Sequence, residues 1–333
     1  MPANTITQPS RARLRGSRIV VTGGAGFIGS HLVDTLVGKG ADVLVLDDLS
    51  TGTKINVNCS AKFVRGDVTD IRVVRECLRD SELVYHLAAD ATTRESSMGW
   101  LTPEKTLRVN TVGTLNVLEA VVKLNQDTRI VFASSAAVYG EPVFTPVTEQ
   151  HQTNPISPYG VSKLAGEKLV LAYFLELGVK TNIVRIFNTY GPRQSRYVIF
   201  ELLKKLQADQ TRLEVLGNEK IVRDYCYVSD LVRGILLVSE GSASGEIYNI
   251  SGENPVTIGD LVQVILRQLG LAGRTKVRYT GRSWKGDITK MVADTTRIGV
   301  LGFRPVVDLE EGIRLMIDSE WWQAESKGAD GII

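Results

Sequence analysis

The residues of this sequence with the clearest chemical potential are a tyrosine and a lysine four positions apart, Tyr159 and Lys163. Residues at this spacing lie on one face of a helix. A phenol has a pKa of about 10 and a lysine ammonium a pKa of about 10.4. Since a neighbouring positive charge favours the ionised phenol, the spacing predicts that Tyr159 accepts a proton near neutral pH. Ser135 follows a predicted strand and is placed to hydrogen-bond the same substrate oxygen.

By itself, a Tyr-xxx-Lys pair is more often a surface pair, so its meaning depends on a glycine-rich stretch near the N-terminus. There, Gly23, Gly26 and Gly29 stand three residues apart between a β-branched run and a helical pattern. In this setting backbone N–H groups and the helix dipole bind a dinucleotide pyrophosphate. Asp47 ends the next predicted strand about 20 residues on, where a carboxylate binds the ribose and repels a 2′-phosphate. The stretch predicts an NAD site; the plainer alternative is a βα turn whose glycines serve packing.

Strand-like and helix-like segments alternate from residue 18 to about residue 185. This alternation predicts an α/β fold, a Rossmann-type doubly wound parallel sheet with helices on both faces. The rhythm then loosens and returns once, which predicts a smaller, discontinuous C-terminal substrate domain. The expected parts are a disordered tail at 1–17, an NAD-binding domain at 18–187 and 224–252, and a substrate domain at 188–223 and 253–325. A crevice between the two domains should face the carboxyl ends of the strands.

Composition narrows the class of protein. The 333 residues are 43% hydrophobic and 23% charged with a net charge of +2, which gives no electrostatic case for nucleic acid or a membrane surface. No apolar run is as long as a membrane span. Cys59, Cys77 and Cys226 are far apart, and the histidines show no metal-ligand spacing. We therefore expect no metal, no disulfide framework and a cytoplasmic location.

Two predicted helices, 103–124 and 159–177, are apolar almost all round. A helix that rests on a sheet needs only one apolar stripe. The surplus apolar face predicts a symmetric homodimer built from these two helices of each subunit. Burial of that face beneath the chain's own loops is the alternative.

Longer motifs agree with this interpretation. They are TGGAGFIGSHL (22–32), LDDLSTG (46–52), GDVTD (66–70), HLAA (86–89), NTVGTLNVLEA (110–120), SSAAVYG (134–140), SPYGVSK (157–163), RIFNTYGPRQ (185–194), RDYCYVSDL (223–231) and YNISGE (248–253). Together the motifs resemble the extended short-chain dehydrogenase/reductase superfamily, in its branch of NAD-dependent nucleotide-sugar epimerases and dehydratases that includes proteins like UDP-glucose 4-epimerase. The resemblance covers most of residues 18–253.

The resemblance implies a role for each matching residue. On the cofactor it implies Gly23, Gly26, Phe27 and Ile28 at the pyrophosphate, Asp47 and Asp48 at the adenosine side with Leu49 and Gly52 nearby, Asp67 and Val68 at the adenine, and Leu87, Ala88, Ala89 and Asn110 along the remainder. For catalysis it implies Tyr159 as the base, Lys163 as its electrostatic helper and a contact of the nicotinamide ribose, and Ser135 on the substrate. For the diphosphate of a nucleotide sugar it implies Asn188, Arg223 and Arg282, since arginine forks match phosphate oxygens. Whether Arg282 or Lys285 meets phosphate stays open.

The two residues after Ser135 indicate the reaction. In the family that the sequence resembles, dehydratases carry Asp-Glu there and decarboxylases a Glu at the second position, whereas this chain has Ala136 and Ala137. The resemblance therefore implies epimerisation at C4 of a UDP-hexose, glucose/galactose type or a variant, through a transient 4-keto sugar and with tightly bound NAD. A hexuronate, an N-acetylhexosamine or an unusual sugar stays open. The alternatives are a decarboxylase or dehydratase of the same family and a non-catalytic NAD-binding sensor.

Overall fold

The computed structural model describes residues 14–91, 102–124, 127–281 and 288–328. A parallel sheet of seven strands forms its centre, in the order β10-β6-β5-β4-β1-β2-β3. The strands are β1 (Arg18–Thr22), β2 (Asp42–Asp47), β3 (Lys62–Arg65), β4 (Leu83–His86), β5 (Arg129–Ser135), β6 (Thr181–Ile186) and β10 (Glu246–Ile250). The strand order reverses between β1 and β4, which is the doubly wound arrangement. The predicted fold class is confirmed.

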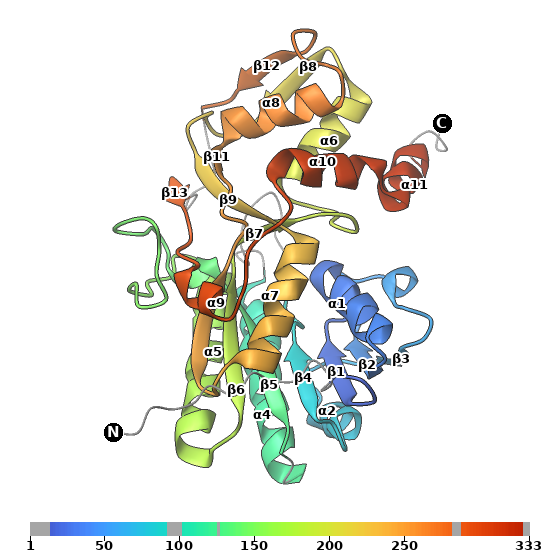
Figure 1. Cartoon of the computed structure of the whole chain (residues 1–333), viewed down its shortest axis with the longest axis vertical. Coiled ribbons are helices and arrows are strands. Elements are labelled where there is room, and N and C mark those ends of the chain that lie inside the picture. The colour runs from blue at the N-terminus through green and yellow to red at the C-terminus, as the bar shows by residue number, and fades with distance from the viewer. Residues whose placement is uncertain (1–13, 92–101, 125–126, 282–287, 329–333) are drawn as a thin grey trace.

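Helices cover both faces of this sheet (Figure 1). On one face, α1 (Phe27–Gly38) and α7 (Val228–Gly241) share an apolar core with the strands. On the other face, α2 (Ile71–Leu78), α4 (Gly113–Leu124) and α5 (Pro158–Leu177) do the same. Strands buried on both faces are expected to read as continuous apolar runs, and the Ile-Val-Val run of β1 is fully buried.

A second region lies above the carboxyl ends of the large sheet in Figure 1 and has its own apolar core. A small sheet joins β7 (Asn188–Tyr190), β9 (Val222–Tyr227), β11 (Pro255–Thr257) and β13 (Lys290–Met291), and β8 (Arg212–Val215) pairs with β12 (Lys276–Tyr279). Its helices are α6 (Val198–Ala208), α8 (Ile258–Gln268), α10 (Leu309–Asp318) and α11 (Glu320–Gly328). The division of the chain into two domains stays a prediction.

Several shorter segments complete the fold. The helix α9 (Thr296–Val300) lies in sequence between β13 and α10 of the second region, yet Ile298 packs in the core of the large sheet. Short 3₁₀ turns, η1 (Lys54–Asn56) and η3 (Ala136–Val138), follow β2 and β5. Residues 1–13 of the predicted tail lie outside the described residues, whereas Leu14 is buried in the core beside α1.

The helix that carries Tyr159 has clear end signals. Ser157 precedes it and accepts a hydrogen bond from the Gly160 N–H, Pro158 occupies its first position, and Gly178 ends it with a φ of 68°. An N-cap serine, a proline at the first position and a left-handed glycine at the C-terminus are favourable for a helix. These local signals explain why the prediction for 159–177 agrees closely with α5.

The other helix of the predicted dimer runs without a break but contains a π-helical turn. It consists of α3 (Pro103–Leu107), a π-helical turn η2 (Arg108–Val112) and α4. The turn contains the buried Asn110, and π-helical turns inside helices often lie at functional sites. Across the described residues, no helix combines the length and apolar character that a membrane crossing requires.

Candidate functional site

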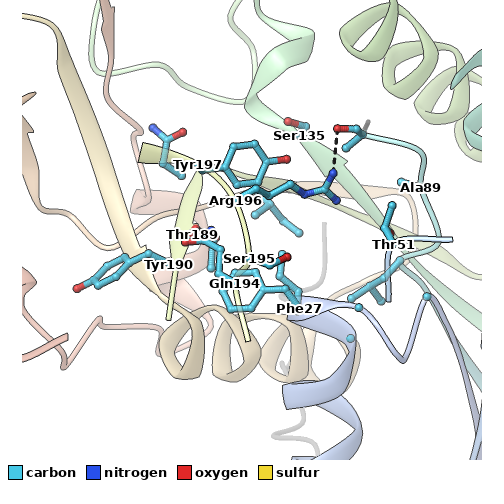
Figure 2. Close-up of a pocket in the computed structure, with 18 of the residues that line it drawn as sticks. Phe27, Thr51, Ala89, Ser135, Thr189, Tyr190, Gln194, Ser195, Arg196 and Tyr197 are labelled. Carbon is cyan, nitrogen blue, oxygen red and sulfur yellow. Dashed lines mark hydrogen bonds between the residues drawn. The ribbon is translucent and has the colours of Figure 1, made fainter. Parts of the chain in front are cut away.

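A cavity of about 820 Å³ lies at the carboxyl ends of the large sheet and is lined by both regions of the molecule (Figure 2). Ligands of doubly wound sheets bind at this edge, where the strand order reverses. Most of the predicted site residues line it: Gly23, Gly26, Phe27, Ile28, Asp47, Asp48, Asp67, Val68, Leu87, Ala88, Ala89, Ser135, Tyr159, Lys163, Asn188 and Arg223. The cavity residues do not include Leu49, Gly52 and Asn110, and Arg282 lies outside the described residues.

The glycine turn has the shape that a pyrophosphate needs. Gly23 has a φ of +73°, and a Cβ there would lie 2.7 Å from the Ala88 nitrogen. A Cβ on Gly29 would lie 2.1 Å from the Gly23 carbonyl oxygen, so both positions require glycine. The helix α1 starts at Phe27 without a side-chain cap and without an acidic residue in its first turn. Its N-terminal N–H groups and dipole are therefore available to an anion.

Asp47 is fixed beside this turn. Its Oδ2 accepts a hydrogen bond from the Ala25 N–H at 3.0 Å, and its Oδ1 accepts one from the Leu49 N–H at 2.8 Å. Burial raises the pKa of Asp47, while these two hydrogen bonds work to lower it. Gly52 does not line the cavity because it faces the glycine turn, where a Cβ would lie 2.7 Å from the carbonyl carbon of Ala25. Gly52 thus packs the loop after β2 against the glycine turn.

A buried histidine that the sequence interpretation missed supports the next cavity segment, residues 87–89. The Thr114 hydroxyl donates to the Asn110 carbonyl at 2.6 Å and therefore accepts from His86 Nε2 at 3.0 Å. This leaves His86 Nδ1 as the acceptor of the Thr22 hydroxyl at 2.7 Å, and the Thr22 oxygen accepts the Ala88 N–H at 3.2 Å. Burial lowers the pKa of His86 to about 3, so the ring stays neutral in this tautomer.

Asn110 acts on the site through its neighbours. Its Oδ1 accepts the Asp90 N–H at 2.7 Å, and its Nδ2 donates to the Asp90 carbonyl at 3.0 Å and to the Ser162 hydroxyl oxygen at 2.9 Å. The Ser162 hydroxyl in turn donates to the Tyr159 carbonyl at 2.7 Å. Asn110 therefore ties the segment after β4 to the first turns of α5, which carry the predicted base.

The predicted catalytic residues meet at the floor of the cavity. Ser135 lines the cavity and acts to lower the pKa of the Tyr159 phenol against burial, and Tyr159 stays partly accessible through the cavity. The Lys163 ammonium is buried, donates to the Ala133 carbonyl at 2.8 Å and lies 6.0 Å from the centre of the Tyr159 ring. The structure thus brings together a phenol, a hydroxyl and a buried ammonium.

The electrostatics of this group correct one expectation. Burial raises the pKa of Tyr159, and Lys163 alone does not reverse that effect, whereas the sequence interpretation expected a phenol that ionises easily beside both Lys163 and the positive nicotinamide of NAD⁺. Burial also lowers the pKa of Lys163 to about 7, against the opposing pull of the Glu167 charge. The reason is that taking both groups out of water disfavours the charged form of each. The protein alone therefore holds a neutral phenol beside an ammonium that is readily deprotonated.

One turn further along α5, a fully buried ion pair forms that was also missed. Glu167 accepts two hydrogen bonds from Arg185, at 2.9 and 2.7 Å, and a third from the Ser134 hydroxyl at 2.5 Å. Arg185 also donates to the Tyr139 oxygen and to the Glu149 carbonyl, both at 2.9 Å. Burial works to lower the pKa of Arg185, but the bonds and charge of Glu167 outweigh it and the net direction is upward.

The wall opposite the sheet comes from the second region. Asn188 and Arg223 line it as predicted, and so do residues that the sequence interpretation left unassigned: Thr189, Tyr190, Gln194, Ser195, Arg196, Tyr197, Tyr225 and Trp321. Figure 2 shows several of them converging from β7 and the segment before α6. The signal that could have found them is the polar run Arg-Gln-Ser-Arg-Tyr directly after the Gly-Pro turn at 191–192. Within the described part of the chain, no group of three or more His, Cys, Asp or Glu side chains is placed to hold a metal.

Comparison with known proteins now identifies the family. A family model described as GDP-mannose 4,6 dehydratase matches residues 20–316. The chain belongs to the NAD-dependent nucleotide-sugar epimerases, dehydratases and decarboxylases. Because the glycine turn, the uncapped start of α1 and Asp47 fit a dinucleotide, and relatives bind NAD, the cofactor of this family member is NAD.

Three relatives show how wide the chemistry of the family is. A Methanocaldococcus jannaschii protein named "Putative UDP-glucose 4-epimerase" is 36% identical over 306 residues, which is 90% of this chain and 97% of that protein. UDP-glucuronic acid decarboxylase 1 of Xenopus tropicalis is 34% identical over 313 residues, 90% of this chain and 71% of that protein. A dTDP-glucose 4,6-dehydratase structure from Streptomyces venezuelae with NAD bound has a TM-score of 0.84 and 30% identity, covering 94% of this chain and 98% of that chain. Overall similarity therefore leaves the individual reaction open.

Proposed function

We propose that this family member inverts the configuration at C4 of a UDP-hexose, of the glucose/galactose type or a variant, through a transient 4-keto sugar. NAD supplies the hydride acceptor and donor that such an oxidation and reduction require. The relative named as a UDP-glucose 4-epimerase, similar over nearly its whole length, supports this choice.

The observation that carries the proposal is the pair of methyl groups beside Ser135. Ala136 and Ala137 form the start of η3 and both line the cavity. Elimination of water from the sugar requires an acid for the departing hydroxyl and a base for the neighbouring carbon. Alanine can be neither. The side chains that remain at this end of the cavity suit one proton transfer at one oxygen.

In the proposed reaction, Tyr159 acts as the phenolate, which the positive charges of Lys163 and of a bound NAD⁺ would favour. The phenolate oxygen accepts the proton of the O4 hydroxyl, and the resulting phenol later returns it. The Ser135 hydroxyl, at the same end of the cavity, hydrogen-bonds the same substrate oxygen. Lys163, fixed by the Ala133 carbonyl at 2.8 Å, supplies positive charge beneath the phenol ring. Asn188 and Arg223 bind the diphosphate, as the family resemblance implies, and leave the sugar ring free to present either face.

A specific observation favours one rival, since a relative of similar identity is named as a decarboxylase of UDP-glucuronic acid. The discriminating experiment incubates the purified protein separately with UDP-glucose, UDP-N-acetylglucosamine and UDP-glucuronate and identifies products by NMR and carbon dioxide by trapping. We expect the C4 epimer of at least one of these sugars. Release of carbon dioxide or a 4-keto-6-deoxy product, without any C4 epimer, would reject epimerisation.

The role of Tyr159 has its own test. Tyr159→Phe removes the proton acceptor and leaves the ring, so turnover should fall by on the order of 10²- to 10⁴-fold. NAD content, measured after denaturation, should stay that of the unmodified protein, because the glycine turn and Asp47 are intact. Unchanged turnover would refute the role of Tyr159 and reopen the non-catalytic sensor as a function.

The finer proposals on assembly and location also stand as predictions. Apolar side chains of the helices 103–124 and 159–177 remain exposed: Leu107, Val112, Val122, Val161, Leu175 and Leu177. They support the proposed homodimer, and Leu175→Glu should shift the sedimentation of the protein toward a monomer. A monomer before any mutation, at micromolar concentration, would refute the dimer. The three unpaired cysteines support the proposed cytoplasmic location.

A further inference from the structure

One face of α1 connects the cofactor side of the cavity to the wall opposite. Phe27, His31 and Asp34 follow one another along this face at spacings of four and three residues. Phe27 packs against the apolar core of the second region, and in Figure 2 it points toward Gln194. Gln194 belongs to the loop between β7 and α6, residues 191–197, here called the cavity loop. The helix that starts at the glycine turn therefore also contacts the second region.

His31 makes the second contact of this face. Its Nε2 lies 2.9 Å from the Pro192 carbonyl oxygen. A carbonyl oxygen only accepts hydrogen bonds, so Nε2 carries the proton and donates it. Burial lowers the pKa of His31, so the ring is neutral near pH 7. The Phe27 ring meets it edge-on with the ring centres 5.9 Å apart, which supports the position of the imidazole.

The third contact is an ion pair with the next residue of the cavity loop. Arg193 Nη1 donates to Asp34 Oδ2 at 2.8 Å, and Asn58 Nδ2 donates to Asp34 Oδ1 at 2.8 Å. Asn58 thus orients the carboxylate from the cofactor side, while Arg193 reaches it from the cavity loop. The side chains of Arg193 and Asp34 are 27% and 35% exposed, so water screens this pair less than it screens a fully exposed one.

The backbone of the cavity loop needs contacts of this kind to keep its shape. Arg193 has a φ of 69° and Tyr197 a φ of 77°. A positive φ is unfavourable for residues that carry a side chain, and it persists where the surrounding structure holds it. The loop starts against α7, where a Cβ on Gly191 would lie 2.6 Å from Val228 Cγ1. The two polar contacts with α1 come directly after this fixed point and offset the strain.

We propose that His31 and Asp34 are positioning residues of a clasp, formed with Pro192 and Arg193, that keeps the cavity loop closed over bound NAD. The inference rests on NAD as the cofactor and goes beyond the proposed reaction. Arg193 and all later residues of the loop line the cavity that the glycine turn borders, whereas His31 and Asp34 do not line it. The two α1 residues consequently act on the cofactor through the loop.

Retention of the cofactor follows from the position of the clasp. The start of α1 offers its N–H groups to the pyrophosphate, and the clasp ties the next two turns of the same helix to the opposite wall. To widen the cavity at this end, the loop has to break both polar contacts with α1. The clasp therefore slows the dissociation of NAD, which an enzyme that regenerates its cofactor in each turnover does not need to release.

The test measures how fast NAD leaves the protein. Protein loaded with isotope-labelled NAD is chased with excess unlabelled NAD, without any sugar. For Asp34→Ala the dissociation rate constant should rise by about 3- to 10-fold, since a partly exposed ion pair is lost. Asp34→Glu keeps the charge and should restore most of the retention. His31→Phe keeps a ring and removes the donor, and should raise the rate constant by about 2- to 10-fold.

A double-mutant comparison separates the clasp from a general loss of stability. In the Arg193→Ala background, Asp34→Ala should change the rate constant by less than about twofold, because its partner is already absent. Asp42→Ala breaks the exposed pair with Lys62 in the large sheet and should leave the rate constant unchanged. The inference would be overturned by an equal rise in Asp42→Ala, or by the same rise from Asp34→Ala with and without Arg193.

Hydrogen exchange of the NAD-free protein gives a second readout, in a variant that keeps the size of the side chain. In Asp34→Asn, the amides of residues 191–197 should exchange faster, while those of β1 keep their protection. Unchanged exchange of the cavity loop, together with unchanged NAD dissociation, would refute the clasp. Neither measurement uses a sugar, so a failure of C4 epimerisation leaves this inference standing, and a failure of the clasp leaves the proposed reaction untouched.

Discussion

Two buried clusters on the same helix have opposite electrostatic designs. At the first turns of α5, burial pushes Tyr159 and Lys163 toward their neutral forms, and the pKa of Lys163 falls to about 7. One turn later, Glu167 is buried together with Arg185 of β6, and the two satisfy each other with two hydrogen bonds. The comparison teaches that charged groups of α5 serve stability where they have a partner charge within the protein and can serve function where they have none. The Glu167–Arg185 pair fixes α5 to β5 and β6, whereas Tyr159 and Lys163, which form no ion pair with each other, remain available for a substrate and NAD.

The largest expected effect lies in the paired cluster. Glu167→Ala leaves the Arg185 guanidinium buried without its carboxylate and removes the acceptor of the Ser134 hydroxyl. The free energy of unfolding should fall by about 3–5 kcal/mol. Chemical denaturation measures it, and Asp127→Ala, which breaks the exposed pair with Lys180, is the control at about 0–1 kcal/mol. If the free energy of unfolding fell by the same small amount in both variants, the Glu167–Arg185 pair would not be what stabilises this part of the fold.

The second prediction concerns the unpaired cluster and pH. Burial lowers the pKa of Lys163 to about 7 from 10.5, so between these values the unfolded chain binds one more proton than the folded protein. The contribution of Lys163 to stability therefore rises with pH across this window and is flat below pH 7. Lys163→Met removes the titration. The difference in unfolding free energy between the NAD-free protein and this variant should show that slope between pH 7 and 9.5, and a flat difference would contradict the lowered pKa.

The smallest expected effect separates two adjacent serines. The Ser134 hydroxyl donates to the buried Glu167 carboxylate, so Ser134→Ala should cost about 1.5–3 kcal/mol of stability. Ser135 lines the cavity at the Tyr159 end, so Ser135→Ala should lower turnover and leave the melting temperature nearly unchanged. Thermal melts and initial rates of both variants measure this contrast. Interchanged effects would mean that the strand presents its serines the other way round.

The sequence predicted the cofactor half of the molecule well, because its signals are local. The first strand, the glycine turn, the first helix and the second strand, which ends with Asp47, form one continuous stretch of the chain. Glycine at position 23 is required by its positive φ and by the close approach of Ala88. The Tyr159–Lys163 spacing likewise follows from the helical period, and the cap residues of α5 stand next to it in the chain. Asn110 was predicted as a site residue from the family resemblance, but its contact with the segment after β4 depends on a π-helical turn that the apolar pattern did not reveal.

By itself, the sequence determined the α/β class, the nucleotide turn and the spacing of the candidate base and its lysine, since these depend on periods of a few residues. Only the tertiary structure decided that the Ser134 hydroxyl binds Glu167, that Arg185 neutralises Glu167, and that Arg196 lies against the Ala91 carbonyl. Each of these contacts joins segments distant in the chain. The tertiary structure also decided the directions of the pKa shifts of Tyr159 and Lys163, because burial by packed neighbours outweighs the charge of an adjacent side chain.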